Sequence, residues 1–529
     1  MEDMVRELEK INSKNELETF IDNLRIFTSN YRNYKANKEI IEQAINKAKN
    51  IHDKKSLVKL LEIKSTQLEQ SLENLDVIID LTDEMKKISE EIGYYGGLAL
   101  ACNIDWYAEK IKGNKERSLQ ALEKSIKYIA QEESIGSYEY HVCNYSFAVE
   151  KWLSEHDTAV AAILEKCATY FFENGFNRSF IQSISMLVII YTRLQNGRKI
   201  LELCKRIFVN RDFFDKLPLD VKAISYDFVG LGYMLDLNLN FAESFFEEAY
   251  TLFKPIYKES IYFSNFIILH SFIISVKALQ GKLEQTWKLI KDAENLLLED
   301  FFEKNLDSGT KKQIRHTLNL NKFYVYSRLK DYDSVEIQDL MKEIFEGSKT
   351  LYSDFMLLSE FLLNANLKPA ELEELLNSDN FSINRVKHLI SYIILKGSDN
   401  ENSGKKAEKS IEVLRNRVTN TKTTFIENVF SDLLIAQQFY SLRRFSEIYP
   451  LLQKYENKLD RIQVLELRIF MEAFIQIGAF KNGNPMGPAL QYVAIRKCQQ
   501  YGFSRLEYKL LNYLELQAKD VLKSMKRIS

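Results

Sequence analysis

The chain runs through long stretches that no helix-breaking residue interrupts, and this feature limits its fold more than any other. Among 529 residues there are only 6 prolines and 18 glycines. A protein built from β-strands needs frequent tight turns, and tight turns use both residues heavily. Within these stretches apolar residues recur every three or four positions, as they do along one face of an α-helix. We therefore predict an all-α fold.

A chain of this length is too long for one compact core, so it forms either several domains or an array that grows by repetition. Apolar residues make up 46% of the sequence and charged residues 28%, which is typical of a folded chain and not of a disordered one. A repeat array predicts a sequence pattern that recurs at a regular spacing.

Residues 226–255 carry the most specific pattern in the chain. Its small residues let two antiparallel helices approach closely, and its large residues fill the space between neighbouring helix pairs. A proline at the end of the pattern stops the second helix. In order, the pattern consists of Tyr226, Val229, Gly230, Tyr233, Ala242, Phe246, Ala249 and Pro255.

This order resembles the tetratricopeptide repeat, in which a large residue, a Leu-Gly pair and a tyrosine precede alanine, phenylalanine, alanine and proline. The resemblance implies an α-solenoid of antiparallel helix pairs that forms a right-handed superhelix. Weaker copies of the pattern place small or apolar residues in the same packing positions of other pairs. These residues are Ser118, Leu122 and Ser125; Ile200, Cys204 and Ile207; and Thr286, Ile290 and Ala293.

The predicted turns between successive pairs recur roughly every 40 residues, which is longer than the about 34 residues of the shortest helical repeats. This spacing resembles the long-helix tetratricopeptide variant of bacterial signalling and regulatory proteins. Within three of the pairs we expect the turn at Gly113, at residues 330–331 and near Arg443. Between pairs, the expected turns lie near Asp53, Gly93, Gly136, Gly175, Phe214 and Ile256.

The array divides the chain into three parts. We interpret residues 1–35 as an N-terminal helical cap, because a terminal repeat must present a polar outer face to water. Residues 36–396 form the repeat array, and residues 405–529 form further repeats of the same kind. The stretch between them, residues 397–404, is polar and contains two glycines, so we predict an exposed loop there.

Composition also limits where the protein works and what it binds. The formal net charge of −2 provides no general positive surface, so we expect no nucleic-acid partner. The N-terminus lacks the apolar core of a signal peptide, and no apolar run approaches the about 18 residues of a membrane span. Scattered cysteines, odd in number and without a CxxC pair, predict buried thiols in a reducing compartment, which indicates the cytoplasm. They are Cys102, Cys143, Cys167, Cys204 and Cys498.

The nearest match to a catalytic motif lies at residues 391–413. A phosphate-binding loop requires four residues between its first glycine and a following Gly-Lys-Ser/Thr, so that backbone N–H groups wrap the phosphates. Here six residues separate Gly397 from Gly404, and Lys406 occupies the position of the required hydroxyl. We interpret this segment as a solvated loop between helices.

Two His-Asp dipeptides, at residues 52–53 and 156–157, resemble the core of one class of helical metal phosphohydrolase. That class needs a further upstream histidine, and none precedes His52. Both dipeptides lie at predicted turns, where Asp53 and Asp157 are suited to capping the next helix. The sequence contains no HExxH, GxSxG or GxGxxG, and its N-terminal helices lack the basic recognition helix of a DNA-binding domain. We therefore predict no catalytic residues, no metal site and no cofactor.

The resemblance implies that the first helix of each pair lines an inner, concave face, and that exposed residues of these helices bind a partner. Amides, tyrosines and arginines are suited to holding an extended peptide, because they can bond its backbone or a carboxylate. We predict Trp106, Trp152 and Trp287 to be core residues instead. The candidate partner-binding residues are Asn103, Tyr107, Lys110, Tyr145, Gln182, Arg193, Asp227, Asn321, Tyr324, Arg328, Gln437 and Tyr440.

These observations predict a non-catalytic scaffold or adaptor that binds another protein or a peptide on the concave face of the solenoid. A second hypothesis is a sensor-regulator that resembles bacterial peptide-pheromone receptors, in which a peptide closes the superhelix and changes what the outer face binds. A third is an enzyme whose site is built onto the array, and no motif in the chain supports it.

Overall fold

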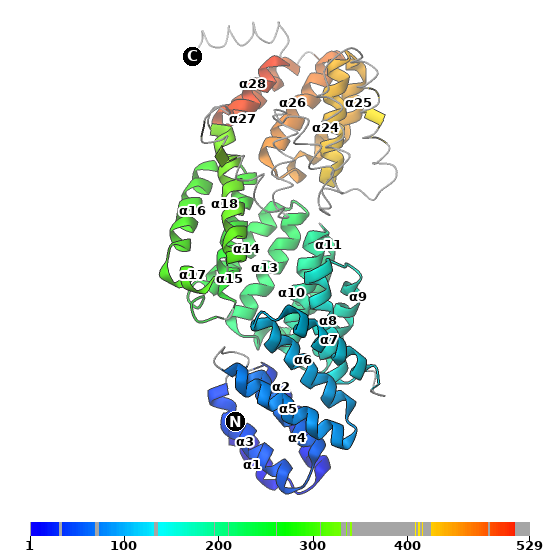
Figure 1. Ribbon diagram of the computed structural model, residues 1–529. Helices are drawn as coiled ribbons and strands as arrows, with labels where there is room; N and C mark the ends of the chain where they lie inside the picture. The colour runs from blue at the N-terminus through cyan, green and yellow to red at the C-terminus, as the bar shows by residue number, and fades with distance from the viewer. Residues whose placement is uncertain are drawn as a thin grey trace. The chain divides into compact units, whose positions relative to one another are not determined.

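The computed structural model contains helices as its only regular secondary structure among the residues that it describes. The chain divides into two compact units, Met1–Ile190 and Tyr191–Ser529, whose helices are labelled in Figure 1. Isolated residues between 335 and 415 are also described. The described segments are residues 2–30, 34–68, 74–131, 136–194, 196–209, 211–260, 262–306, 308–329, 425–484 and 487–513.

Unit 1 is a stack of antiparallel helices in which each helix packs against the next, from α3 through α9. Alternate helices also touch, since α2 contacts α4, α4 contacts α6 and α6 contacts α8. Such a double set of contacts is the packing of an α-solenoid. The helices are α1 (Glu2–Lys10), α2 (Lys14–Asn30), α3 (Tyr34–Asn50), α4 (Lys54–Leu68), α5 (Leu75–Ile92), α6 (Tyr95–Ile111), α7 (Lys115–Ile129), α8 (Tyr138–Glu155), α9 (Val160–Glu173) and α10 (Asn177–Arg193), which ends in unit 2.

Unit 2 continues the same pattern, with α13 paired to α14, α15 paired to α16, and α18 packed against α15 and α16. Its first part contains α11 (Gly197–Val209), α12 (Arg211–Asp215), α13 (Leu219–Leu235), α14 (Leu239–Phe253), α15 (Phe263–Leu279), α16 (Leu283–Leu297), α17 (Asp300–Asn305) and α18 (Ser308–Leu329).

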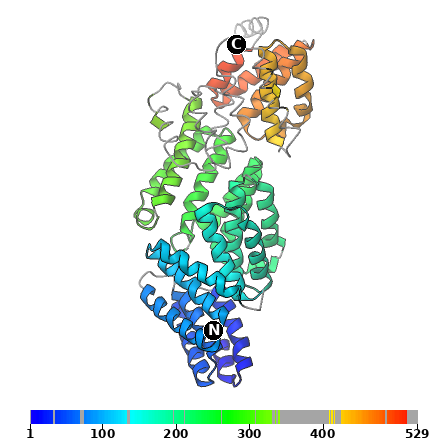
Figure 2. The same cartoon turned by 45° about the vertical axis from the view of Figure 1, so that its right-hand side comes forward.

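A C-terminal group of helices, orange and red in Figure 1 and Figure 2, completes unit 2. It begins with α24 (Phe425–Ser441), and near Arg443, where a turn is predicted, the backbone takes a positive φ of 58°. The second helix expected after this turn is not continuous, and Pro450, which lacks a backbone N–H, lies within the irregular stretch. The remaining elements are η2 (Phe445–Glu447), α25 (Ile448–Leu452), η3 (Gln453–Arg461), α26 (Leu465–Lys481), α27 (Gly487–Tyr501) and α28 (Ser504–Asn512).

The predicted repeat length is confirmed by the positions at which the first helices of successive pairs begin. Consecutive starts lie 39 to 44 residues apart. At the expected turns, Gly93, Gly136 and Gly175 all have positive φ, a conformation that glycine adopts without strain. The first helices begin at Lys54, Tyr95, Tyr138, Asn177, Leu219 and Phe263.

The pair α13–α14 confirms the packing predicted from residues 226–255. A Cβ atom on Gly230 would lie 2.5 Å from the ring of Phe246, so the two helices approach as closely as a glycine allows. Phe246 is fully buried, as are Ala242 and Ala249. Pro255 follows α14, which ends at Phe253. The packing residues predicted in the weaker copies, from Ser118 to Ala293, are also buried.

The C-terminal group packs against the turns that join α13 to α14 and α15 to α16. Gln463 donates to the Asn238 side chain (3.0 Å) and accepts from the backbone N–H of Asn240 (2.8 Å). Gly281 lies so close to Leu465 that a Cβ atom there would be 2.6 Å from its side chain. The first part of unit 2 and its C-terminal group therefore form one packed body.

Several predicted features lie outside the described residues. These include the loop 397–404, most of the segment that resembles a phosphate-binding loop, and the turn at residues 330–331. Among the residues that the structure does describe, no helix is long and apolar enough to cross a membrane. All five cysteines are buried and form no disulfide, as predicted.

Candidate partner-binding site

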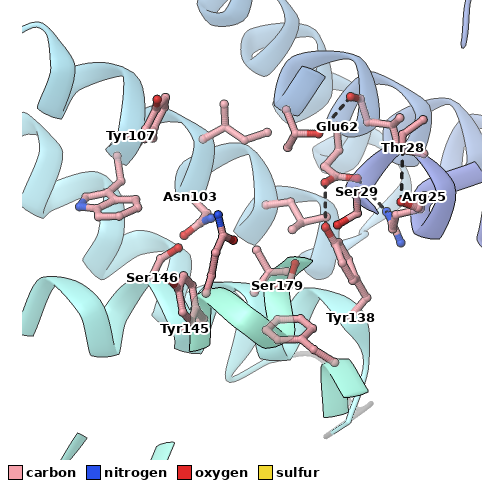
Figure 3. A pocket seen from close by; sticks show the side chains of 18 of the residues that line it. Arg25, Thr28, Ser29, Glu62, Asn103, Tyr107, Tyr138, Tyr145, Ser146 and Ser179 are labelled. Carbon is pink, nitrogen blue, oxygen red and sulfur yellow. Dashed lines mark hydrogen bonds and ion pairs between the residues drawn. The ribbon is translucent and has the colours of Figure 1, made fainter. Parts of the chain in front are cut away.

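A cavity of about 300 Å³ lies inside unit 1 (Figure 3). Its walls come from α2, α4, α6, α8 and α10. One further lining residue, Phe171, belongs to α9, which is the second helix of its pair. Four of these five wall helices, namely α4, α6, α8 and α10, are the first helices of successive pairs. The cavity therefore lies on the face that first helices share, where the sequence predicts partner contacts.

Helical spacing explains why the lining residues face a common space. On α8, Tyr138, Val142 and Tyr145 follow one another at intervals of four and three residues, which places them on one side of the helix. On α6, Asn103 and Tyr107 lie one turn apart for the same reason. The sequence thus directs a stripe from each first helix toward the cavity.

Four of the predicted partner-binding residues meet at this cavity. Asn103 and Tyr107 come from α6, Tyr145 from α8 and Gln182 from α10. Asn103 is only 9% exposed, and its Oδ1 atom has no hydrogen-bond partner among the described residues. Tyr107, Tyr145 and Gln182 are half-buried. Amide and phenol groups from three repeats therefore surround one space.

Trp106 is buried, as expected of a core residue, but it also lines the cavity. Its indole N–H donates to Glu150 (3.3 Å), and Glu150 also pairs with Lys110. The Lys110 ammonium lies 5.1 Å from the centre of the Trp106 ring. Lys110 is exposed and does not line the cavity itself, so this predicted site residue supports the wall instead.

Buried charges form one end of the cavity, where Arg25 and Glu62 lie in Figure 3. The Nε atom of Arg25 donates to Glu62 (3.1 Å), and its Nη1 atom is 3.5 Å from Glu139. The side chains of all three are at least nine-tenths buried. A buried ion pair must offset the loss of hydration of both charges, so these side chains depend on one another for compensation.

Two tyrosines complete this cluster. Tyr138 donates its hydroxyl hydrogen to Glu62 (3.3 Å), and the guanidinium of Arg25 stacks over the Tyr138 ring at 4.3 Å. Tyr94 donates to Glu139 (3.1 Å). Burial raises the pKa of Glu62, and the charge of Arg25 offsets this only in part. For Glu139 burial also raises the pKa, but the charges of Arg25 and Lys59 and the hydrogen bonds to the carboxylate together outweigh it, and the net shift is downward.

The sequence analysis missed Arg25 and Glu62, although a signal for Arg25 is present. Leu17, Ile21 and Leu24 form the buried stripe of α2, and Arg25 continues it four residues after Ile21. A charged residue within an apolar stripe is rarely buried without a partner. No local feature identifies Glu62 or Glu139 as that partner, because both are distant in sequence.

The prediction of exposed partner contacts is wrong for Asn321, Tyr324 and Arg328, which are 0%, 1% and 0% exposed. Asn321 donates to Ser275 of α15 (3.0 Å). Arg328 donates to Glu466 of α26 through Nε (2.9 Å). The face of α18 that carries these residues contacts α15 on one side and α26 on the other. Helix α26 begins more than a hundred residues after α18 ends.

The other predicted site residues of unit 2 also lie away from an open surface. Asp227 and Gln437 are buried, so the expectation that they are exposed is wrong. Tyr440 is half-buried against Tyr513, with ring centres 4.9 Å apart. Arg193, at the end of α10, is half-buried and does not line the cavity of unit 1. No common site joins these residues.

A second hollow of about 510 Å³ lies along α5, α6 and α7. Its central cation, Lys86, pairs with Asp105 (2.6 Å) and Asp83 (3.0 Å). Thr82 donates to the other oxygen of Asp105 (2.7 Å). The Asp83 side chain is 68% exposed, so water screens these charges, and this hollow is less suited than the first cavity to hold a ligand by charge.

Of the two His-Asp dipeptides, the first takes the capping role predicted from sequence, whereas the Asp157 side chain of the second accepts a backbone hydrogen bond only from the residue before its helix. Asp53 accepts hydrogen bonds from the backbone N–H (3.3 Å) and hydroxyl (2.6 Å) of Ser56 in the first turn of α4. Asp157 accepts from the backbone N–H of Ala159, directly before α9 (2.8 Å). Among the described residues, no three His, Cys, Asp or Glu side chains are grouped to hold a metal ion.

Comparison with known proteins gives no relative from which a function could be transferred. No protein-family model matches the chain, and no curated protein is significantly similar to it in sequence.

Proposed function

We propose that this chain is a non-catalytic scaffold or adaptor, and that the cavity of unit 1 holds a segment of a partner protein or a peptide. The observation that carries the proposal is the meeting of Asn103, Tyr107, Tyr145 and Gln182 in one cavity. Side-chain amides can bond the backbone of an extended segment, and tyrosines provide rigid contact area at a small entropic cost.

The size and lining of the cavity also favour a binding role. Sites for small ligands commonly enclose about 300–1,000 Å³ and combine apolar walls with a few polar groups. Here aromatic and aliphatic side chains form most of the wall, and the buried Arg25 and Glu62 mark one end. A single residue or a short segment of a partner fits such a space.

We further propose that the repeats belong to the tetratricopeptide class, in its long-helix form. Support comes from the close approach at Gly230 and from first helices that begin 39 to 44 residues apart. A location in the cytoplasm is supported by five buried thiols without a disulfide.

A sensor-regulator is the second candidate, and one observation favours it. Arg25, Glu62 and Tyr138 come from three separate helices and meet at the cavity through buried polar contacts. A ligand that alters these contacts changes how α2, α4 and α8 pack, which is a route to a change of shape. Solution scattering separates the two functions, because a sensor becomes more compact when its peptide is added and a scaffold keeps its dimensions.

The proposal is tested with peptides selected from a randomised display library against the full chain. Fluorescence anisotropy then gives the Kd of each peptide for the wild type, for a double variant with Asn103→Ala and Gln182→Ala, and for Asn46→Ala. Asn46 is an exposed residue of α3 outside the cavity, so its variant is the matched control. We expect the double variant to bind at least tenfold more weakly, which corresponds to about 1.4 kcal/mol, and Asn46→Ala to bind like the wild type. Equal affinities for all three proteins contradict the proposed site.

A further inference from the structure

The charged end of the cavity in unit 1 has one positive charge too few. One guanidinium, that of Arg25, lies between two carboxylates, those of Glu62 and Glu139. With both carboxylates ionised the cluster carries a net charge of −1 in a site that water hardly reaches. Burial of an uncompensated charge is strongly unfavourable.

No second cation of the described residues forms an ion pair with Glu62 or Glu139. The nearest candidate is Lys59 of α4, whose charge acts on Glu139 from a distance. The Lys59 ammonium pairs instead with Glu18 (2.8 Å) and lies 3.8 Å from Asp22. Lys55 also lies 4.0 Å from Glu18, so two lysines face these two carboxylates and leave no positive charge over for Glu62 or Glu139.

Without a ligand, protonation of one of the two carboxylates is the simplest way to remove the excess negative charge. Burial raises the pKa of Glu62, as expected for a carboxyl that shares one cation with a second carboxylate. Of the two carboxyls, Glu62 lines the cavity and Glu139 does not. A ligand that brings its own positive charge can therefore compensate the excess negative charge at Glu62.

We infer that this cavity binds an ammonium group of a peptide ligand, with the ammonium at Glu62 and an apolar body along α6 and α8. This inference rests on the proposed function. The positive charge completes the cluster. Tyr107 lies at the other end of the cavity in Figure 3, and Ile104 of α6 and Val142 of α8 add apolar wall. Asn103 and Tyr145 line the stretch between the ends.

An anionic ligand does not suit this site, although Arg25 lines it. Its guanidinium contacts Glu62 and Glu139 through Nε and Nη1, and although Nη2 has no hydrogen-bond partner among the described residues, a third negative charge would bring the net charge of the cluster to −2. Two sources of an ammonium remain, the amino terminus of a peptide and the side chain of a lysine. The chemistry at Glu62 is the same for both.

Three short peptide amides test the inference on the full chain. Ala-Phe-Ala amide has a free amino terminus, acetyl-Lys-Phe-Ala amide has a lysine ammonium, and acetyl-Ala-Phe-Ala amide has neither. NMR titration gives the Kd of each. At least one charged peptide is expected to bind about tenfold more tightly than the neutral one, and which one does so identifies the source of the ammonium. Equal binding of all three peptides, or binding of none, overturns the inference.

The variant Glu62→Gln provides the second arm of the test. It keeps the size of the side chain, replaces one accepting oxygen with an NH₂ donor and removes the excess charge, so the preference for an ammonium should disappear. Glu91→Gln, on the exposed side of α5, is the control and should keep the preference. Thermal unfolding checks that both variants fold. An ammonium preference that persists in folded Glu62→Gln contradicts the inference.

Failure of this inference and failure of the proposed function are distinguishable. If display-selected peptides lose affinity in the Asn103 and Gln182 double variant but show no need for an ammonium, the cavity is a binding site and only the assignment of its charged end is wrong. If no selected peptide depends on the cavity, both ideas are wrong.

Discussion

Arg328 of α18 and Glu466 of α26 form a buried ion pair in which two nitrogens of one side chain share a single oxygen of the other. Nε and Nη2 of Arg328 lie 2.9 Å and 2.5 Å from Oε2 of Glu466, and the side chains are 0% and 1% exposed. The guanidinium also stacks on Tyr324, 3.4 Å from the ring centre. This pair ties the C-terminal helices of unit 2 to its repeat array.

The variant Glu466→Gln tests how much this ion pair stabilises unit 2. It removes the negative charge of Glu466 from the buried guanidinium of Arg328, and removal of one partner of a buried ion pair costs about 3–5 kcal/mol. We expect the free energy of unfolding of unit 2 to fall by an amount of this order, measured by urea denaturation. Asp300→Asn, which breaks an exposed pair with Lys304, should have little effect. A stability for Glu466→Gln equal to that of the wild type would show that the pair does not hold α26.

Asp227 should make unit 2 less stable as the pH rises. Burial raises its pKa to about 8, and its Oδ1 atom has no hydrogen-bond partner among the described residues. In the unfolded chain the carboxyl ionises near its ordinary pKa of 3.8. Between about pH 4 and pH 8 the folded state therefore binds the extra proton, and the free energy of unfolding falls by up to about 1.4 kcal/mol per pH unit.

Asp227→Asn removes this dependence, so the variant should be more stable than the wild type at pH 7 and less sensitive to pH. Urea denaturation at several pH values between 4 and 8 measures the difference. Asp300→Asn serves as the control, because Asp300 is exposed. Parallel pH profiles for Asp227→Asn and the wild type would mean that Asp227 is paired or hydrated in the folded protein.

Gly230→Ala should destabilise unit 2 although alanine favours helices. The added Cβ would meet the ring of Phe246 at 2.5 Å, and this ring is fully buried and cannot move aside. Overpacking of this kind costs about 1–3 kcal/mol, which exceeds the about 1 kcal/mol that alanine contributes over glycine in a helix. Adding Phe246→Leu should restore part of the loss in thermal unfolding. A Gly230→Ala variant at least as stable as the wild type contradicts the close packing of α13 and α14.

The five cysteines should resist thiol reagents while the protein is folded. All are buried, and burial raises the pKa of Cys102 to about 11 and that of Cys143 to about 12. Reaction requires the thiolate and access to it. We expect Ellman's reagent to react slowly with the native protein in buffer and to react rapidly with all five thiols in urea. Fast labelling of the native protein would indicate that a repeat opens readily.

The sequence was sufficient for those parts of the fold that depend on neighbouring residues. The pair around Gly230 and Phe246, the repeat length, and the capping role of Asp53 all follow from local spacing and residue size. The sequence placed Asn103 and Gln182 on first helices, but that both line one cavity comes from the structure.

Contacts between distant segments could not be predicted in this way. Nothing near Arg328 indicates that Glu466, 138 residues later, covers it. The same reason explains why Arg25 and Glu139 were not recognised as parts of one site, since 114 residues separate them. Helical periodicity assigns a face to each residue, but it does not say which other helix covers that face.

Hydrogen-exchange mass spectrometry of the full chain, with and without a display-selected peptide, tests most directly that the cavity of unit 1 is the binding site. The account predicts slower exchange on peptide addition in α4, α6 and α8, whose residues line the cavity, and no change in α24 or α26. The same protection should be lost in the Asn103→Ala and Gln182→Ala double variant. Protection confined to α5 and α7, or to unit 2, would contradict the account.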